Sequence, residues 1–135
     1  MKIKLAHIVS ILLVMVFLHF VANATGLYET RIIWIDKVLH IMAGAAVAML
    51  WIWFLQGKNV VIANLSSLLV VSSVVGTVAL LAVSWEILEY IFWKGLPQYA
   101  ETYNIYSPTI FDLLSDVAFN VIGGAIFTLY WKNKT

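Results

Sequence analysis

The sequence predicts an all-α integral membrane protein, a four-helix bundle with short loops and an interfacial helical extension after the third span. Two observations predict this class. The chain of 135 residues is 63% hydrophobic and 11% charged, whereas a soluble domain has about 25% charged residues and about 45–50% apolar ones. The apolar residues also gather in four long segments, each near the roughly 20 residues that a transmembrane helix needs. We therefore expect a single transmembrane domain over residues 1–135.

The first predicted span covers about residues 5–22 and follows the basic start Met-Lys-Ile-Lys. This segment also has features of a secretory signal, because Ala22-Asn23-Ala24 has the form of an Ala-x-Ala cleavage site. Its apolar stretch is somewhat long for a signal, so we expect a retained helix. In the alternative, residues 1–24 are a cleaved signal, three spans remain and the new amino terminus lies outside.

The second span is predicted at about residues 34–55. The third apolar stretch, residues 60–93, is too long for one perpendicular crossing. We expect a span at 60–83 that continues to residue 93 as a helical extension along the interface. The fourth span is predicted at about 109–131, directly after Pro108, because proline suits the first turn of a helix.

The distribution of Lys and Arg predicts the orientation of these spans. The side with the termini would carry five of these cations and the opposite side three. By the positive-inside rule, both termini then lie in the cytoplasm. The five are Lys2, Lys4, Lys58, Lys132 and Lys134, and the three are Arg31, Lys37 and Lys94.

All seven acidic residues fall at the helix ends opposite the termini, on one predicted side of the membrane. Ionisable groups this close to the hydrocarbon are costly, and their default interpretation is a functional site. Acidic residues contribute little to the positive-inside rule, so their segregation is independent information. The seven are Glu29, Asp36, Glu86, Glu89, Glu101, Asp112 and Asp116.

Helical spacing gives three of the predicted spans a polar face near this end, because residues three or four apart in a helix lie on one side. A single acid near a helix start is often only a cap or a partner of the helix dipole. Three such faces at similar depth predict one shared site. The faces are Asp36 with His40, Glu86 with Glu89, and Asp112 with Asp116 and Asn120.

Several carboxylates in a pocket of low dielectric cannot all remain ionised. Either a divalent cation neutralises them, or some are protonated and bond neighbouring helices, and both alternatives remain open. A set rich in carboxylate oxygen suits Mg²⁺, Mn²⁺ or Ca²⁺, whereas Zn²⁺ usually has more His or Cys ligands. The predicted metal ligands are Asp36, Glu86, Glu89, Asp112, Asp116 and Asn120, and the predicted catalytic residues are His40 and Asp116.

Three motifs occur in order along the chain. They are Asp36-Lys37-x-x-His40, Ser84-x-Glu86-x-x-Glu89, and Asp112-x-x-x-Asp116-x-x-x-Asn120-x-x-Gly123-Gly124. Their combination, over roughly residues 35–131, resembles the small bacterial VanZ-like membrane proteins and, more closely, the DUF2238 or YjdF-like inner-membrane proteins. The resemblance implies a bundle of four or more helices in the bacterial cytoplasmic membrane, with its polar face at the outer side.

Three classes of function fit these observations. The first is a metal-dependent enzyme of the cell envelope that acts on a membrane lipid or lipid-linked substrate, with the cation polarising an oxygen and His40 moving protons. The second is a small cation- or proton-binding carrier. The third is a structural membrane protein whose acids only bond helices together. The net charge of +1 gives no basis for nucleic-acid binding, and the sequence does not determine the oligomeric state.

Overall fold

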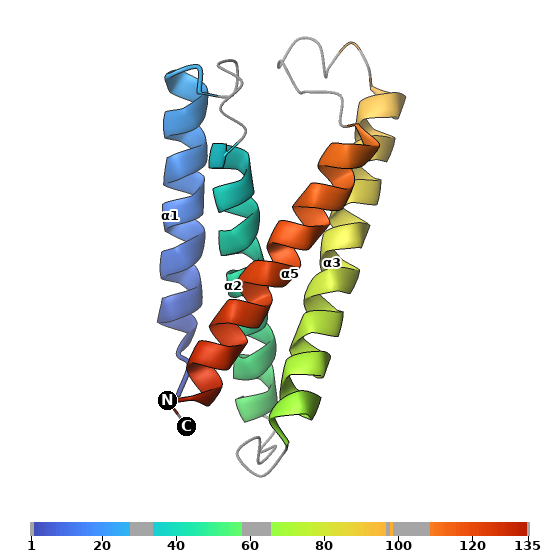
Figure 1. Ribbon diagram of the computed structural model, residues 1–135. Coiled ribbons are helices and arrows are strands. Elements are labelled where there is room, and N and C mark those ends of the chain that lie inside the picture. The colour runs from blue at the N-terminus through green and yellow to red at the C-terminus, as the bar shows by residue number, and fades with distance from the viewer. Residues whose placement is uncertain (1, 28–33, 58–65, 97, 99–108, 135) are drawn as a thin grey trace.

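The protein folds into long helices that run alternately up and down (Figure 1). The computed structural model describes residues 2–27, 34–57, 66–96, 98 and 109–134. Within these ranges each of the four helices is long and apolar enough to cross a membrane, which confirms the predicted all-α membrane bundle. The helices are α1 (Leu5–Ala24), α2 (Trp34–Gly57), α3 (Ser67–Gly95) and α5 (Ile110–Lys132).

The up-and-down order brings both termini to one end of the bundle, here called the terminal end (Figure 1). The opposite end holds the start of α2, the last turns of α3 and the start of α5. It carries Asp36, Glu86 and Asp116, and we call it the polar end. Among the described residues, the acids therefore lie at the end opposite the termini, as the sequence predicts.

Helix α3 is continuous over 29 residues. At 1.5 Å per residue it is about 43 Å long, so about 13 Å would extend beyond a hydrocarbon core of about 30 Å. Its amino terminus is capped by the Ser66 hydroxyl, which accepts the N–H of Leu69 at 3.2 Å. The predicted start of this span at residue 60 lies outside the described residues.

A stripe of residues four apart forms the buried face of α3. Val70, Val74, Val78 and Ala82 are all at most 7% exposed, and Glu86, at 5%, is the next member of the same stripe. Residues at this spacing share one side of a helix. Glu86 therefore faces the bundle for the same geometric reason as the valines.

Comparable stripes run along α2 and α5. Each is apolar or small toward the terminal end and polar toward the polar end. Because the three stripes pack together, the change in polarity divides the interior into an apolar half and a polar half. The stripe on α2 comprises Asp36, His40, Gly44, Ala48 and Ile52, and that on α5 comprises Asp116, Asn120, Gly124 and Thr128.

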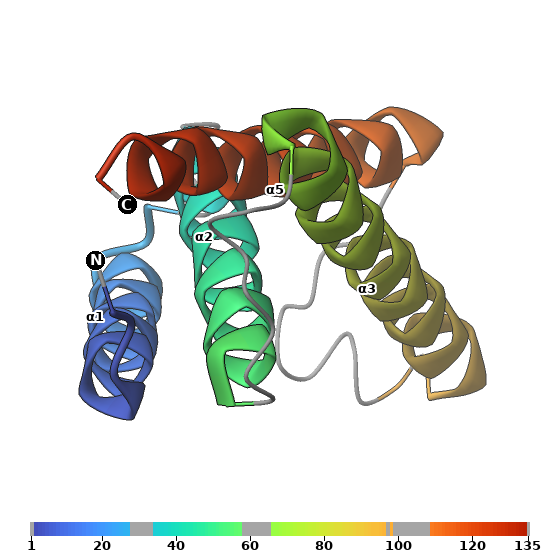
Figure 2. The same cartoon turned by 90° about the horizontal axis from the view of Figure 1, so that it is seen from below.

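Helix α5 lies across α2 and α3 on one side of the bundle (Figure 2). Its contact with α2 is a close backbone approach. A Cβ atom on Gly44 would overlap the Asn120 carbonyl, and one on Gly123 would overlap the Ile41 carbonyl. Small residues allow helices in lipid to approach this closely. The crossing brings the turn of α5 with Asp116 and Asn120 against the first turns of α2.

The terminal half of the bundle holds an apolar core, formed by the ends of the three stripes and the amino-terminal segment. Helix α1 stands at the edge and packs chiefly on α2 (Figures 1 and 2). Most of its apolar side chains are exposed and would face lipid. The core consists of Ile3, Ile8, Ala48, Ile52, Val70, Val74, Val78 and Trp131.

Candidate functional site

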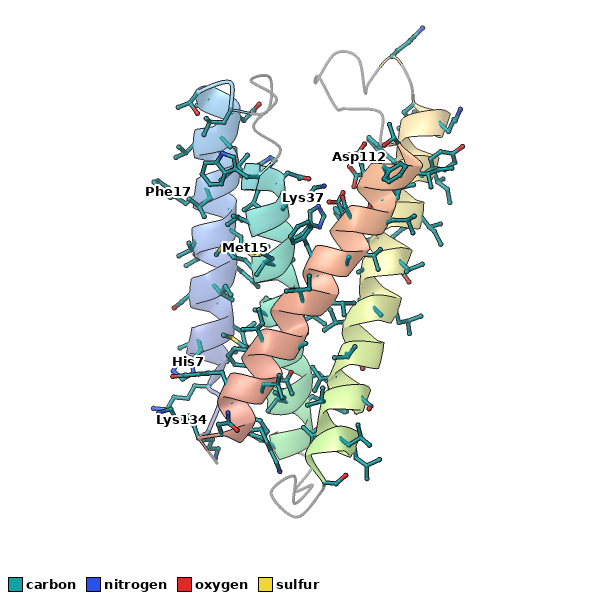
Figure 3. The ribbon with its side chains drawn as sticks, in the orientation of Figure 1. His7, Met15, Phe17, Lys37, Asp112 and Lys134 are labelled. Carbon is teal, nitrogen blue, oxygen red and sulfur yellow. The ribbon has the colours of Figure 1, made fainter. Side chains whose placement is uncertain are left out.

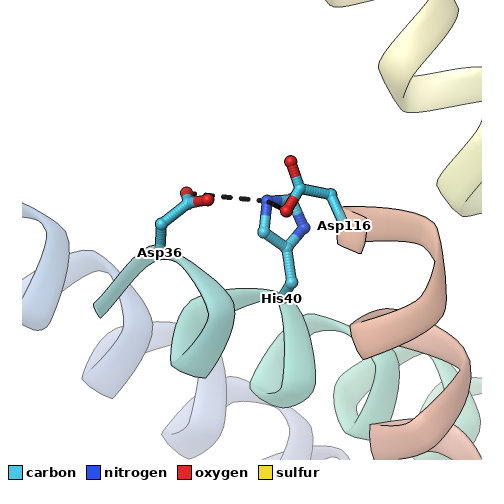
Figure 4. A group of neighbouring side chains, drawn as sticks. All are labelled: Asp36, His40 and Asp116. Carbon is cyan, nitrogen blue, oxygen red and sulfur yellow. Dashed lines mark ion pairs between the residues drawn. The ribbon is translucent and has the colours of Figure 1, made fainter. Parts of the chain in front are cut away.

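A compact polar cluster joins α2 and α5 at the polar end (Figure 4). Asp36 and His40 come from the first two turns of α2, and Asp116 comes from the second turn of α5. One possible ligand atom from each of the three lies within 4.8 Å of the other two. His40 Nε2 is 3.6 Å from Asp36 Oδ1 and 3.5 Å from Asp116 Oδ1. Three of the predicted site residues are therefore brought together.

Lys37 connects the two carboxylates of this cluster. Its Nζ donates to Asp36 Oδ2 at 3.2 Å and also to Asp116 Oδ1. The Lys37 side chain is 11% exposed, so the ammonium is held inside the bundle, between the start of α2 and α5 (Figure 3). The sequence placed Lys37 on the same side as the acids, as a cation among them, but Lys37 was not among the predicted metal ligands or catalytic residues. Its position directly after Asp36, at the start of a polar helix face, was the available signal.

Asn120 fixes the protonation pattern of His40. The Asn120 Nδ2 donates to the Asp116 backbone carbonyl at 2.9 Å and lies 2.9 Å from His40 Nδ1. A carbonyl oxygen can only accept, so the amide nitrogen must face this side. His40 Nδ1 then accepts the second amide hydrogen, and the ring proton is on Nε2. The nitrogen that faces Asp36 and Asp116 is thus a donor.

Glu86 adds a third buried acid from α3. It is 5% exposed, and its Oε1 has no hydrogen-bond partner within the described part of the chain. Asp116 and His40 are among its electrostatic neighbours. An unpartnered buried carboxylate oxygen carries a desolvation penalty of about 1–3 kcal/mol or more. Glu86 would therefore be stabilised by a proton or by a cation.

The remaining predicted ligands lie less centrally. Asp112, at the start of α5 (Figure 3), accepts the N–H and the hydroxyl of Thr109 at 3.1 and 2.5 Å and so closes the capping box of this helix. The half-buried Glu89 is within electrostatic range of His40 and Asp116. Asp112 thus has the capping role that a single acid near a helix start often has. Glu29 and Glu101 lie outside the described residues.

The described side chains of the cluster carry excess negative charge. The Lys37 ammonium pairs with Asp36 and Asp116, and Glu86 and Glu89 add two more carboxylates within electrostatic range of these acids. His40 is neutral in the pattern that Asn120 imposes. At low dielectric such an imbalance is strongly unfavourable. The cluster is therefore suited to take up positive charge, as protons or as a metal cation.

A family model described as a predicted membrane protein, DUF2238, matches residues 1–133. Neither the curated proteins nor the solved structures contain a match to the chain. The family match spans all four helices and the whole polar cluster, and it confirms the predicted likeness to DUF2238. The likeness to VanZ-like proteins stays a prediction. The chain belongs to DUF2238, a family of predicted membrane proteins.

Proposed function

We propose that this protein binds a divalent cation at its polar end, through the carboxylates of Asp36, Asp116 and Glu86. One observation carries the proposal. Possible ligand atoms of Asp36, His40 and Asp116 lie within 4.8 Å of one another, beside a buried Glu86 whose Oε1 has no partner in the described chain. Mg²⁺ and Ca²⁺ bind oxygen ligands at about 2.0–2.6 Å, so opposite ligands are about 4–5 Å apart. The spacing in the cluster is comparable.

The ligand chemistry favours a hard cation over zinc. A metal-bound His normally donates its other ring N–H to a neighbour, whereas His40 Nδ1 accepts from Asn120. His40 would bind a metal through Nε2 only after the Asn120 amide had flipped, so that its oxygen instead of its nitrogen faced His40. The carboxylates need no such change, so Mg²⁺, Mn²⁺ or Ca²⁺ is the expected ion. It would compete with the Lys37 ammonium for Asp36 and Asp116.

We propose further that the site acts on a membrane lipid or lipid-linked envelope substrate. The cluster lies near helix ends, which in a bilayer would be close to the depth at which lipid headgroups meet the hydrocarbon. A bound cation would polarise a phosphoryl or carbonyl oxygen. The Nε2–H of neutral His40 would donate a hydrogen bond to the charge that develops on that oxygen, and Asp116 would orient the ring. We place the protein in the bacterial cytoplasmic membrane, with its polar end at the outer side and both termini in the cytoplasm.

A proton-binding carrier is the second candidate function. The Lys37 bridge favours it, because an ammonium already occupies the oxygens that a metal would need. In this case Glu86 would take up a proton instead of sharing a metal. The two candidates differ in whether the purified protein holds a metal ion.

Binding of Mn²⁺ to the detergent-purified protein tests the proposal. We expect saturable binding to the wild type, and at least a 10–100-fold loss of affinity in Asp116→Asn, because removal of even an outer-shell partner typically has about that effect. The matched control is Asp112→Asn, four residues away on the same helix. It should retain Mn²⁺ binding and lose only about 1 kcal/mol of stability through the weakened cap.

Two results would overturn the metal proposal. Absence of saturable Mn²⁺ binding to the folded wild type would leave the proton carrier or a structural role. Equal Mn²⁺ affinities of the wild type and Asp116→Asn would place any metal elsewhere. Electron paramagnetic resonance of free Mn²⁺ measures both quantities directly.

A further inference from the structure

A second feature lies in the terminal half of the molecule, away from the polar cluster. An apolar groove of about 440 Å³ separates α1 from α2 and α5. Its volume is within the range of about 300–1,000 Å³ that is typical of ligand sites. The groove is almost entirely hydrocarbon-lined, with two polar residues on α1 near one end. Its lining includes His7, Ser10 and Val14 of α1, Met42 and Met49 of α2, and Phe127 of α5.

The groove runs along the helix axes. His7 and Val14 are seven residues apart on α1, and Met42 and Met49 are seven apart on α2. Both separations correspond to about 10 Å along a helix. Because all four helices are long enough to span a membrane, this direction follows the bilayer normal, as acyl chains do. The two methionines provide a flexible apolar wall that adapts to such a chain.

Cationic side chains lie at the end of the bundle where His7 lines the groove. The ring of His7 accepts the N–H of Lys4 at its Nδ1, at 3.2 Å, so the ring proton of neutral His7 is on Nε2. Lys4 and Lys134 are exposed at the same end, and Figure 3 shows His7 and Lys134 close to the two termini. The end of the bundle where His7 lines the groove therefore also carries the side chains of Lys4 and Lys134.

We propose that this groove binds one acyl chain of an anionic glycerophospholipid, whose phosphate lies at His7, Lys4 and Lys134. The apolar walls open toward hydrocarbon, where acyl chains are the surrounding solvent. The cationic side chains at this end select the headgroup, since each Lys near an anionic lipid surface strengthens binding about fivefold. The site shares no residue with the polar cluster, so its test does not depend on whether the proposed metal binding is correct.

Native mass spectrometry of the full-length protein measures the retained lipid. The protein would be exchanged into detergent with phosphatidylglycerol or phosphatidylcholine. We expect at least about fivefold preference for phosphatidylglycerol in the wild type, and loss of this preference in Lys4→Gln/Lys134→Gln. Val14→Phe fills the groove and should reduce retained lipid by about fourfold or more, the effect of displacing one methylene.

Val16→Phe is the matched control. Val16 lies on the same helix and is 53% exposed, against 47% for Val14, but it does not line the groove. It should retain lipid like the wild type. Equal retention of the two lipids by the wild type, or equal retention by folded Val14→Phe and Val16→Phe, would overturn the proposal. A wild-type dimer that Val14→Phe dissociates would also overturn it, because a second copy of the chain would then cover the groove.

Discussion

At the residue scale, Lys37 supplies the positive charge between the carboxylates of the cluster when no metal is bound. Its ammonium holds Asp36 and Asp116 together across two helices that are distant in sequence. Removing one partner of a buried ion pair leaves the other charges uncompensated, and this is usually more harmful than replacing the whole pair. The same ammonium competes with any cation that binds these carboxylates. Lys37 thus affects stability and cation binding in opposite directions.

Lys37→Met should therefore destabilise the protein in a metal-free buffer. We expect a loss of about 3 kcal/mol, the lower end of the range for a broken buried pair, because the Asp36 side chain is 40% exposed. Added Mn²⁺ should restore more stability to this variant than to the wild type. Thermal unfolding in detergent, with EDTA or with Mn²⁺, measures both effects.

Lys94→Met provides the control for Lys37→Met. Lys94 is exposed at the end of α3, with its Nζ 5.8 Å from the centre of the Tyr90 ring. An exposed cation–π contact contributes only about 0.5–1 kcal/mol. A Lys37→Met protein as stable as Lys94→Met in EDTA would contradict the bridging role of Lys37.

At the scale of the elements, the crossing of α2 and α5 decides which polar groups meet. Gly44 and Gly123 each face a backbone carbonyl of the other helix at a distance that excludes a Cβ atom. The close approach lets Asn120 reach His40 and places Asp116 beside Lys37. The buried face of α3 then brings Glu86 to the same depth. The polar cluster therefore depends on glycines that carry no chemistry of their own.

Gly123→Ala should weaken this crossing, because the added methyl group would overlap the Ile41 carbonyl. Overpacking of this kind typically costs about 1–3 kcal/mol, and thermal unfolding in detergent measures it. The control is Gly76→Ala in the interior of α3, where a Cβ atom meets nothing within 4 Å. It should be neutral or gain about 0.5–1 kcal/mol, because alanine is the better helix former. Equal melting temperatures of the two variants would refute the close approach.

At the scale of the whole molecule, the bundle separates a polar end from a terminal end with cationic side chains. The topology that we propose places the first outside and the second in the cytoplasm. Such an arrangement presents the carboxylate cluster to one leaflet and the cationic side chains of the terminal end to the other. The two proposed sites would then act on lipids of different leaflets.

Cysteine labelling in intact cells tests this topology, because the native chain contains no cysteine. Lys94→Cys should react with a membrane-impermeant maleimide added outside, whereas Lys134→Cys should react only after the membrane is permeabilised. Both positions are exposed in the structure. The reverse labelling pattern would invert the bundle and place the carboxylate cluster at the cytoplasmic face.

The sequence by itself determined the membrane class, the all-α bundle and the end at which the acids gather. Hydropathy and helical period are local properties, so the span containing Asp36 and His40 and the span containing Asp116 and Asn120 could be predicted without knowing how they pack. The same local rule placed Glu86 and Glu89 at the end of α3. The family resemblance rested on these ordered motifs as well.

Only the tertiary structure decided which of these groups meet. Asp112 and Asp116 share a helix face and a side-chain type, yet one closes a cap and the other bonds Lys37 across the bundle. The tautomer of His40 likewise depends on Asn120 of another helix. Distances between helices depend on the rotation and crossing of whole elements, and local spacing carries no information about either. The groove beside α1 also depends on how the helices pack, because it forms where α1, α2 and α5 leave a space between them.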